Sequence, residues 1–192
     1  LDVGQGLSVV IRGANHTVVY DTGPKYGARF DTGQQIVTPF LRSQGISRID
    51  RLIVSHNDND HAGGAEALRR NFEINQTLRS LPVNAMDISC DQVDGWIMDG
   101  VKYSLVQHVS IKQINNTNDQ YCVLLVQTKR YTILLPGDIS SDAEERSGMK
   151  GIRDINILIS PNHGTGPTWG PALLIGWAPD ALLALAAITQ WV

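Results

Sequence analysis

The segment that most constrains this chain is residues 56–61, which read His-Asn-Asp-Asn-Asp-His. It follows an apolar run at 51–55 that predicts a buried strand. Two imidazoles and two carboxylates in so short a stretch form an array of metal ligands, because side chains at i and i+2 of an extended segment point to the same side. The spacing predicts one divalent ion shared by His56 and Asp58, with Asp60 and His61 turned toward a second. A solvated polar turn is the alternative interpretation.

The composition excludes several classes of protein. With 192 residues, 42% of them hydrophobic and 18% charged, the chain is predicted to form a single globular domain over 1–192 rather than a disordered or coiled-coil protein. The net charge of −3 gives no general basic surface, so a polyanion has to be bound locally. The apolar window at 172–188 carries Pro179 and Asp180, and we do not interpret it as membrane-spanning. Because nothing like a leader precedes Leu1, we interpret the sequence as part of a longer chain.

The remaining patterns predict strands in two groups, each followed by helices. β-branched runs at 7–12 and 16–21 indicate a hairpin, and the spacing over 34–44 indicates a helix with a kink at Pro39. Residues 72–100 show only weak periodicity, which predicts short strands and loops. Other elements are expected as a helix at 65–70 and as strands at 101–106, 121–128, 131–135 and 155–159, with a hairpin joining 121–128 to 131–135.

Two further residues that can carry chemistry stand after predicted strands. Asp138 ends a Pro-Gly-Asp sequence, and His163 lies in a glycine-rich loop. Since His56 also follows a strand, one sheet edge can gather all of these side chains. Taken singly, each has an ordinary structural role, because Pro-Gly-Asp forms good turns and an isolated His is as often structural.

Several segments together resemble a known family. The sequence at 56–61 is similar to the His-x-His-x-Asp-His signature of metallo-β-lactamase-fold hydrolases, with Asp in place of the second His. Over most of its length the chain resembles the soluble hydrolase domain of the ComEC competence proteins, which form DNA-uptake channels in the inner membrane. The segments that carry this resemblance are LDVGQG at 1–6, VVYDTGP at 18–24, SHNDNDHAGG at 55–64, CDQVDGWIMDGV at 90–101, NDQYCVLLV at 118–126 and LLPGDI at 134–139.

The resemblance implies an α/β fold, the four-layer αββα metallo-β-lactamase-like sandwich, with two divalent metal ions at the rim of its sheets. Because Asp replaces a His in the signature, Mn2+ is expected beside Zn2+ as an occupant. Asp21 would orient the ligand loop by hydrogen bonds. The implied ligands are His56 and Asp58 for the first ion, Asp60, His61 and His163 for the second, and Asp138 as a bridge between them.

The implied activity is that of a metal-dependent nuclease that degrades the DNA strand not imported, with Asp60, Asp138 and Asn162 as catalytic residues. Its expected partners are DNA, single- or double-stranded, and the channel and other domains of a longer membrane protein, without a stable oligomer. The domain would lie on the periplasmic or extracellular side. There Cys90 and Cys122, which the sequence leaves as one bridge or two buried thiols, would pair as a disulfide.

Three departures from the family pattern bear on activity. Asn162 stands where the family carries the first His of a His-His pair, Gln107 stands where it carries the His of Leu-His-Pro, and residues 170–192 match poorly. These departures favour an alternative, a catalytically impaired module that guides DNA without cutting it. A hydrolase of another phosphodiester, such as a phosphorylcholine ester, is a further alternative. Trp169 is the aromatic residue best placed to stack on a base.

Overall fold

The structure is a computed structural model that describes residues 1–106, 121–139, 149, 152–159 and 177–184. These residues belong to two compact units, a first from Leu1–Ser89 and a second from Cys90–Leu185. None of the helices in this part of the chain is long and apolar enough to cross a membrane.

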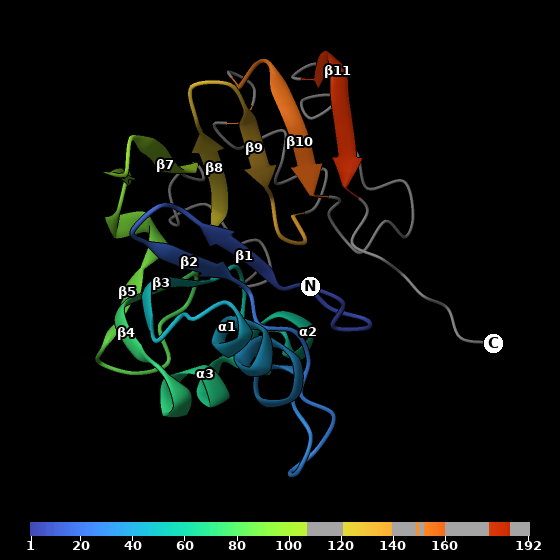
Figure 1. Ribbon diagram of the computed structural model, residues 1–192, viewed down its shortest axis with the longest axis vertical. Coiled ribbons are helices and arrows are strands. Elements are labelled where there is room, and N and C mark those ends of the chain that lie inside the picture. The colour runs from blue at the N-terminus through green and yellow to red at the C-terminus, as the bar shows by residue number, and fades with distance from the viewer. Residues whose placement is uncertain (107–120, 140–148, 150–151, 160–176, 185–192) are drawn as a thin grey trace, which may run out of the picture. The chain divides into compact units, whose positions relative to one another are not determined.

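The first unit contains a five-stranded mixed sheet (Figure 1). Its strands lie side by side in the order β1 (Val9–Arg12), β2 (Thr17–Tyr20), β3 (Arg48–Val54), β4 (Glu73–Arg79) and β5 (Asp87–Ser89). β1 and β2 form the predicted antiparallel hairpin, whereas β2 to β5 run parallel. Because parallel strands end at the same edge of a sheet, the segments that follow β2, β3 and β4 meet there.

Four helical segments join these strands, namely η1 (Gly33–Val37), α1 (Thr38–Ser43), α2 (Asn59–Ala62) and α3 (Ala65–Asn71). The helix predicted over 34–44 is present, but it begins as the π-helix η1 and continues as α1. Pro39 lies in the first turn of α1, which follows η1 without a break. The change of helix type comes directly before the proline, and the kink at Pro39 stays a prediction.

The helices cover the sheet with a compact apolar core. Leu41 of α1 and Leu68 of α3 pack with Val19 of β2 and with Leu52 and Val54 of β3, and all five are fully buried. Each such side chain contributes about 1.5–3 kcal/mol relative to an exposed one. The ends of β2 and β3 are therefore rigidly held, which fixes the segments that leave them.

The second unit contains a six-stranded mixed sheet in the order β11-β10-β9-β8-β7-β6. Its strands are β6 (Gly95–Met98), β7 (Val101–Val106), β8 (Val123–Gln127), β9 (Thr132–Leu135), β10 (Ile155–Ile159) and β11 (Trp177–Ala184). The predicted β8–β9 hairpin is confirmed, and β10 pairs in parallel with both β9 and β11. β11 lies inside 170–192, the segment that matches the family pattern poorly.

The β6–β7 hairpin contributes an aromatic pair to the second unit. The Tyr103 ring is fully buried and stacks on Trp96 with a centroid separation of 5.2 Å and an angle of 7° between the planes. Burial raises the pKa of Tyr103 to about 12, and the charge of Asp99 acts in the same direction. The phenol is therefore neutral at physiological pH and contributes through packing.

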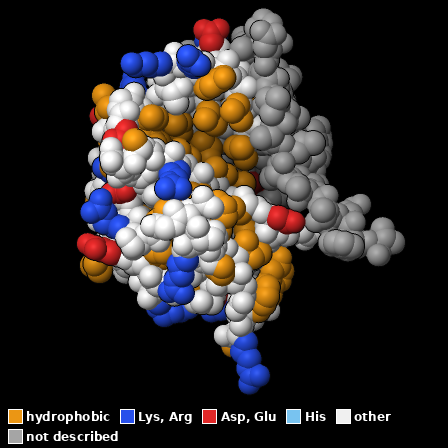
Figure 2. Space-filling view, in the orientation of Figure 1, with side chains coloured by type: hydrophobic (Ala, Val, Ile, Leu, Met, Phe, Trp, Pro, Cys, Tyr) orange, Lys and Arg blue, Asp and Glu red, His pale blue; other side chains and the backbone are white. Residues whose placement is uncertain are grey.

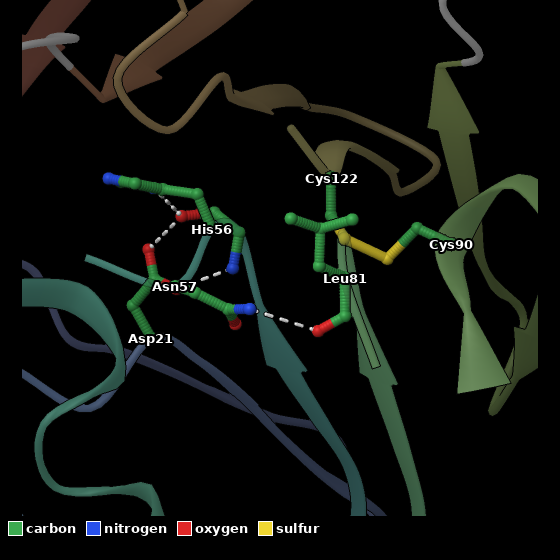
Figure 3. Close-up of a disulfide and its surroundings, with 7 residues drawn as sticks. Asp21, His56, Asn57, Leu81, Cys90 and Cys122 are labelled. Atoms are coloured by element: carbon green, nitrogen blue, oxygen red, sulfur yellow. Dashed lines mark hydrogen bonds between the residues drawn. A yellow bond between two sulfur atoms is a disulfide. The ribbon is translucent and has the colours of Figure 1, made fainter. Parts of the chain in front are cut away.

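A disulfide joins Cys90, the first residue of the 3-10 helix η2 (Cys90–Gln92), to Cys122, which directly precedes β8 (Figure 3). Both cysteines are buried, and their Cα atoms are 5.8 Å apart. With a sequence separation of 32, the crosslink is expected to stabilise the fold by about 3–4 kcal/mol in the chain-entropy model.

We expect protein purified from an oxidising compartment to show no free thiol by mass spectrometry after alkylation without reduction. Reduction should lower the free energy of unfolding by the amount given above, because the unfolded chain regains the entropy of an open loop. A Cys90→Ser/Cys122→Ser variant provides the control, since a reductant should leave its denaturation midpoint unchanged. Two alkylated cysteines in the unreduced wild type would contradict the prediction.

Candidate metal centre

The candidate site is built where parallel strands of the first unit end. Asp21 follows β2, and Ser55 and His56 follow β3. The backbone N–H of Asp21 donates to the carbonyl of Ile53 (2.8 Å), which brings Asp21 beside the end of β3. Asp21 has φ 58°, a left-handed conformation that is uncommon for a residue other than glycine.

The Asp21 carboxylate is fully buried and binds three donors of residues 55–61, which we call the ligand segment. Oδ1 accepts the backbone N–H of Ser55 (2.7 Å), and Oδ2 accepts the Ser55 hydroxyl (2.8 Å). The same Oδ2 lies 2.8 Å from Nδ1 of the buried His61. Asp21 was predicted to orient the ligand segment by hydrogen bonds, and its contacts with Ser55 and His61 agree with that role.

These contacts fix the proton positions on both imidazoles. Because a carboxylate only accepts, Nδ1 of His61 carries a proton, so the neutral ring has its lone pair on Nε2. The Ser55 hydroxyl gives its single proton to Asp21, so it accepts from Nδ1 of His56 at 2.9 Å. Nε2 of His56 is then also the lone-pair nitrogen. Both rings thus present the nitrogen that a metal ion requires.

Each imidazole has a carboxylate of the same segment beside it. Nε2 of His56 is 3.4 Å from Oδ2 of Asp58, and Nε2 of His61 is 3.8 Å from Oδ2 of Asp60. The ligand atoms of His56, Asp58 and Asp60 all lie within 4.8 Å of one another. Two imidazole nitrogens and two carboxylates form a donor set that suits Zn2+ or Mn2+. The residues therefore fit a divalent metal centre.

The ligand segment is less extended than the sequence predicted. Asp58 has extended dihedral angles, but Asp60 and His61 lie on the short helix α2, in which the N–H of Ala62 bonds to the carbonyl of Asp58 (2.9 Å). The turn keeps the two His–Asp pairs together, because the rings of His56 and His61 lie with centroids only 4.1 Å apart.

The glycines after the ligand segment lie against other backbone of the first unit. Gly64 lies directly against the backbone of Gly33 at the start of η1, and a Cβ on either glycine would overlap the other. Gly63 lies as closely against the backbone of Lys25. Both glycines therefore allow backbone segments of the first unit to pack together.

A buried arginine supplies positive charge near Asp21. Arg79 ends β4, pairs with Val54 in the sheet register and is only 5% exposed. Burial lowers the pKa of the Arg79 guanidinium below its ordinary value, whereas the carboxylates of Asp87 and Asp21 act in the opposite direction. An arginine keeps its proton under such conditions, so Arg79 provides a fixed cation behind the ligand segment.

Two residues of the ligand segment were not singled out by the sequence. Ser55 connects Asp21 with His56, and the only sequence signal for it is a hydroxyl residue placed between a strand and a His. Asn57 points its side chain toward the end of β4, where its amide donates to the carbonyl of Leu81 at 3.1 Å (Figure 3). These contacts hold the segment from both sides.

Of the other predicted site residues, Asp138 belongs to the described part of the second unit. Asp138 is half-buried and follows β9, in a turn where Gly137 has φ 64°. Its bridging role stays a prediction. Asn162, His163 and Gln107 lie outside the described residues. Ligation by the six predicted residues is likewise a prediction, for which the first unit supplies a consistent geometry.

An Asp21→Asn substitution should lower the metal affinity of the site about 10–100-fold. Asparagine cannot accept from Ser55 and His61 with both of its side-chain atoms, because its amide nitrogen donates. Opposite His61, that amide would favour the tautomer with a proton on Nε2. Titration with Zn2+ against a competing chelator measures the effect, with Asp31→Asn as the matched control. Unchanged affinity would show that Asp21 does not set the tautomer.

Comparison with known proteins identifies the fold. Residues 1–84, which include Asp21 and the whole ligand segment, match the family model described as the metallo-beta-lactamase superfamily. The structure is similar to MEM-A1, a subclass B3 metallo-beta-lactamase isolated from a soil metagenome library. The TM-score is 0.57 at 15% identity, over 85% of this chain and 77% of that one. The chain is a metallo-beta-lactamase-fold domain. The predicted αββα fold class is thereby confirmed.

This metallo-beta-lactamase-fold domain is also related to competence proteins. It is 30% identical over 187 residues to competence protein ComA of Neisseria gonorrhoeae, covering 95% of this chain and 26% of the relative. It is 29% identical over 195 residues to recombination protein 2 of Haemophilus influenzae, covering 100% of this chain and 24% of the relative. The predicted relation to the ComEC family is confirmed, and the chain spans about a quarter of these relatives. The domain thus combines a metallo-beta-lactamase fold with sequence similarity to part of these competence and recombination proteins.

Proposed function

We propose that the domain hydrolyses phosphodiester bonds with two divalent metal ions, and that its substrate is DNA. One observation carries the proposal: Asp21 and Ser55 set the Nε2 atoms of both His56 and His61 as lone-pair donors, each beside a carboxylate. A structural role alone would not require both imidazoles to present the same nitrogen. The names of the curated relatives support DNA as the substrate.

The residues of the chain provide binding, orientation and charge in this reaction. Divalent ions supply the activation of water and the neutralisation of phosphate charge. Two of them change the formal net charge from −3 to +1, which concentrates positive charge at the ligand segment. Asp60 and Asp138 are the proposed catalytic carboxylates. Asn162 can donate a hydrogen bond to a phosphate oxygen, but it cannot deliver a proton to the leaving group.

Incubation of the purified chain with single- and double-stranded DNA tests the proposal. We expect cleavage with Mn2+ or Zn2+ and none with EDTA. A Glu66→Gln variant, which removes an exposed carboxylate of α3, should cleave like the wild type. Hydrolysis of bis(p-nitrophenyl) phosphate reports the same chemistry on a small diester, and a phosphorylcholine ester provides the competing substrate class. Metal-dependent DNA binding without cleavage would contradict the proposal and favour a module that guides DNA.

We further propose that the domain is part of a longer membrane protein and lies outside the cytoplasm. The disulfide between Cys90 and Cys122 supports this location, because disulfides persist in oxidising compartments. Labelling of these cysteines in intact cells, with and without prior reduction, tests it. Thiols that remain reduced in cells would place the domain in the cytoplasm.

A further inference from the structure

An exposed loop beside the ligand segment combines aromatic rings with positive charges. The segment Pro24–Asp31 connects β2 to the first helices and contains Lys25, Tyr26, Arg29 and Phe30. Tyr26 is 60% exposed and Phe30 is 46% exposed. Isolated apolar residues are common on protein surfaces, but two rings and two cations in one loop form a local surface of distinct chemistry.

The rings of this loop are held in place. The loop closes as a short antiparallel bridge between Lys25 and Asp31, and the N–H of Tyr26 donates to the carbonyl of Phe30 at 2.9 Å. The two rings lie with centroids 5.7 Å apart and planes tilted by 51°. The Tyr26 hydroxyl lies close to Gly4, where an added Cβ would be 2.9 Å from it. The aromatic surface is therefore formed before any ligand arrives.

The loop also carries net positive charge on a chain that is acidic overall. Lys25 and Arg29 are exposed, and no ion pair joins either of them to another described residue. Asp31 uses a carboxylate oxygen to accept the N–H of Gln34 at 2.7 Å at the base of the loop. In Figure 1 the loop projects from the sheet and helices of the first unit, and Figure 2 shows Lys or Arg side chains at its tip.

The base of the loop is bonded directly to the ligand segment. The N–H of Lys25 donates to Oδ1 of Asn59 at 3.2 Å, and Asn59 stands between the predicted ligands Asp58 and Asp60. A ligand bound along the loop therefore extends toward the candidate metal centre. This connection favours a substrate over a membrane surface as the occupant.

We infer that the loop Pro24–Asp31 binds single-stranded nucleic acid, with bases stacked on Tyr26 and Phe30 and phosphates on Lys25 and Arg29. Stacking platforms combined with cations are the usual means by which proteins hold single strands without reading their sequence. Paired bases in a duplex do not expose their faces, so the loop selects single strands. The inference rests on the proposed function, because it names the form of nucleic acid that reaches the same site.

Binding is measured by fluorescence anisotropy with a labelled oligothymidylate longer than about 16 nucleotides, in EDTA so that cleavage does not interfere. The variants are Tyr26→Ser/Phe30→Ser and Lys25→Ser/Arg29→Ser. We expect the aromatic variant to bind at least about tenfold more weakly, since stacking is lost. The cationic variant should lower the slope of log K against log salt by about 0.7 for each phosphate contact removed.

The turn between β8 and β9 provides matched controls, because it carries Lys129, Arg130 and a Tyr131 that is 54% exposed. Tyr131→Ser and Lys129→Ser/Arg130→Ser should bind the oligonucleotide like the wild type. A swap, Tyr26→Phe/Phe30→Tyr, keeps both rings and should retain binding. Equal weakening by the control and loop variants would overturn the inference, and so would loop variants that bind like the wild type.

Three further measurements test whether the occupant of the loop is a single strand. A duplex that binds as tightly as the single strand, with the same dependence on Tyr26, would overturn the single-strand assignment. Loss of binding to phosphatidylglycerol–phosphatidylethanolamine vesicles in the loop variants, with unchanged oligonucleotide binding, would assign the loop to a membrane instead. Loop variants should still hydrolyse bis(p-nitrophenyl) phosphate with Mn2+. If the wild type binds the oligonucleotide but does not hydrolyse this diester, the proposed function alone fails.

Discussion

Replacing Asp60 and His61 together with alanine is expected to abolish binding of the second divalent ion and to reduce phosphodiester hydrolysis to background. The two side chains present Oδ2 and Nε2 atoms 3.8 Å apart, so the variant removes one imidazole and one carboxylate from the same ion. Elemental analysis after reconstitution with Zn2+ or Mn2+ and desalting should show a fall from two ions per chain. The remaining pair, His56 and Asp58, can retain at most one.

Because His61 is fully buried and bonded to Asp21, its loss also affects folding. An Asp60→Asn variant avoids this problem, since the Asp60 side chain is 36% exposed. It should unfold at the wild-type temperature and still lose metal and activity. Glu66→Gln is the control for removal of a carboxylate from the same unit. Two ions per chain in the double alanine variant, or no ion in the reconstituted wild type, would refute the proposed ligand set.

Changing Asn162→His is expected to raise single-turnover DNA cleavage by about 10²–10⁴-fold, the usual range for general acid assistance. The asparagine can bind a phosphate oxygen, whereas a histidine at this position can also protonate the leaving group. DNA affinity and metal content should change little, because His163 and the other predicted ligands are unaltered. Quenched-flow measurement with excess enzyme isolates the cleavage step from product release.

The matched variant is Gln107→His, which restores the other histidine that the family pattern carries. If Asn162→His leaves cleavage unchanged in protein shown to hold two ions, the missing proton donor does not limit the reaction. The Gln107→His variant and residues 170–192 would then be the next features to test.

The strands were the most predictable part of the fold. β3, β8 and β10 are rich in Val, Leu and Ile, which the sequence displays directly. β4 was obscured within 72–100 because its first residues alternate between exposed and half-buried positions and carry polar side chains. The π-helical start of η1 has no known sequence signal, and the pattern over 34–44 could only predict a helix.

The ligands of the first unit were predictable because they are adjacent in sequence. The arrangement that activates them was not, because it depends on contacts between distant residues. The role of Ser55 depends on the hydrogen bond between its hydroxyl and the Asp21 carboxylate, and Asp21 has a left-handed backbone. Tyr26 and Phe30 were overlooked for a similar reason: their exposure is a property of the folded loop, and the sequence directed attention to Trp169 instead.

The two long-range contacts of Asp21 have an entropic consequence for the ligand segment. Its bonds to Ser55 and His61 span 34 and 40 residues. The bond between Asp21 and Ser55 already closes the loop of 34 residues between them. The bond between Asp21 and His61 then restricts only the few residues that separate Ser55 from His61. The segment therefore becomes ordered cooperatively during folding. An incoming ion meets a preorganised chain, and its binding free energy is not reduced by the ordering of that segment.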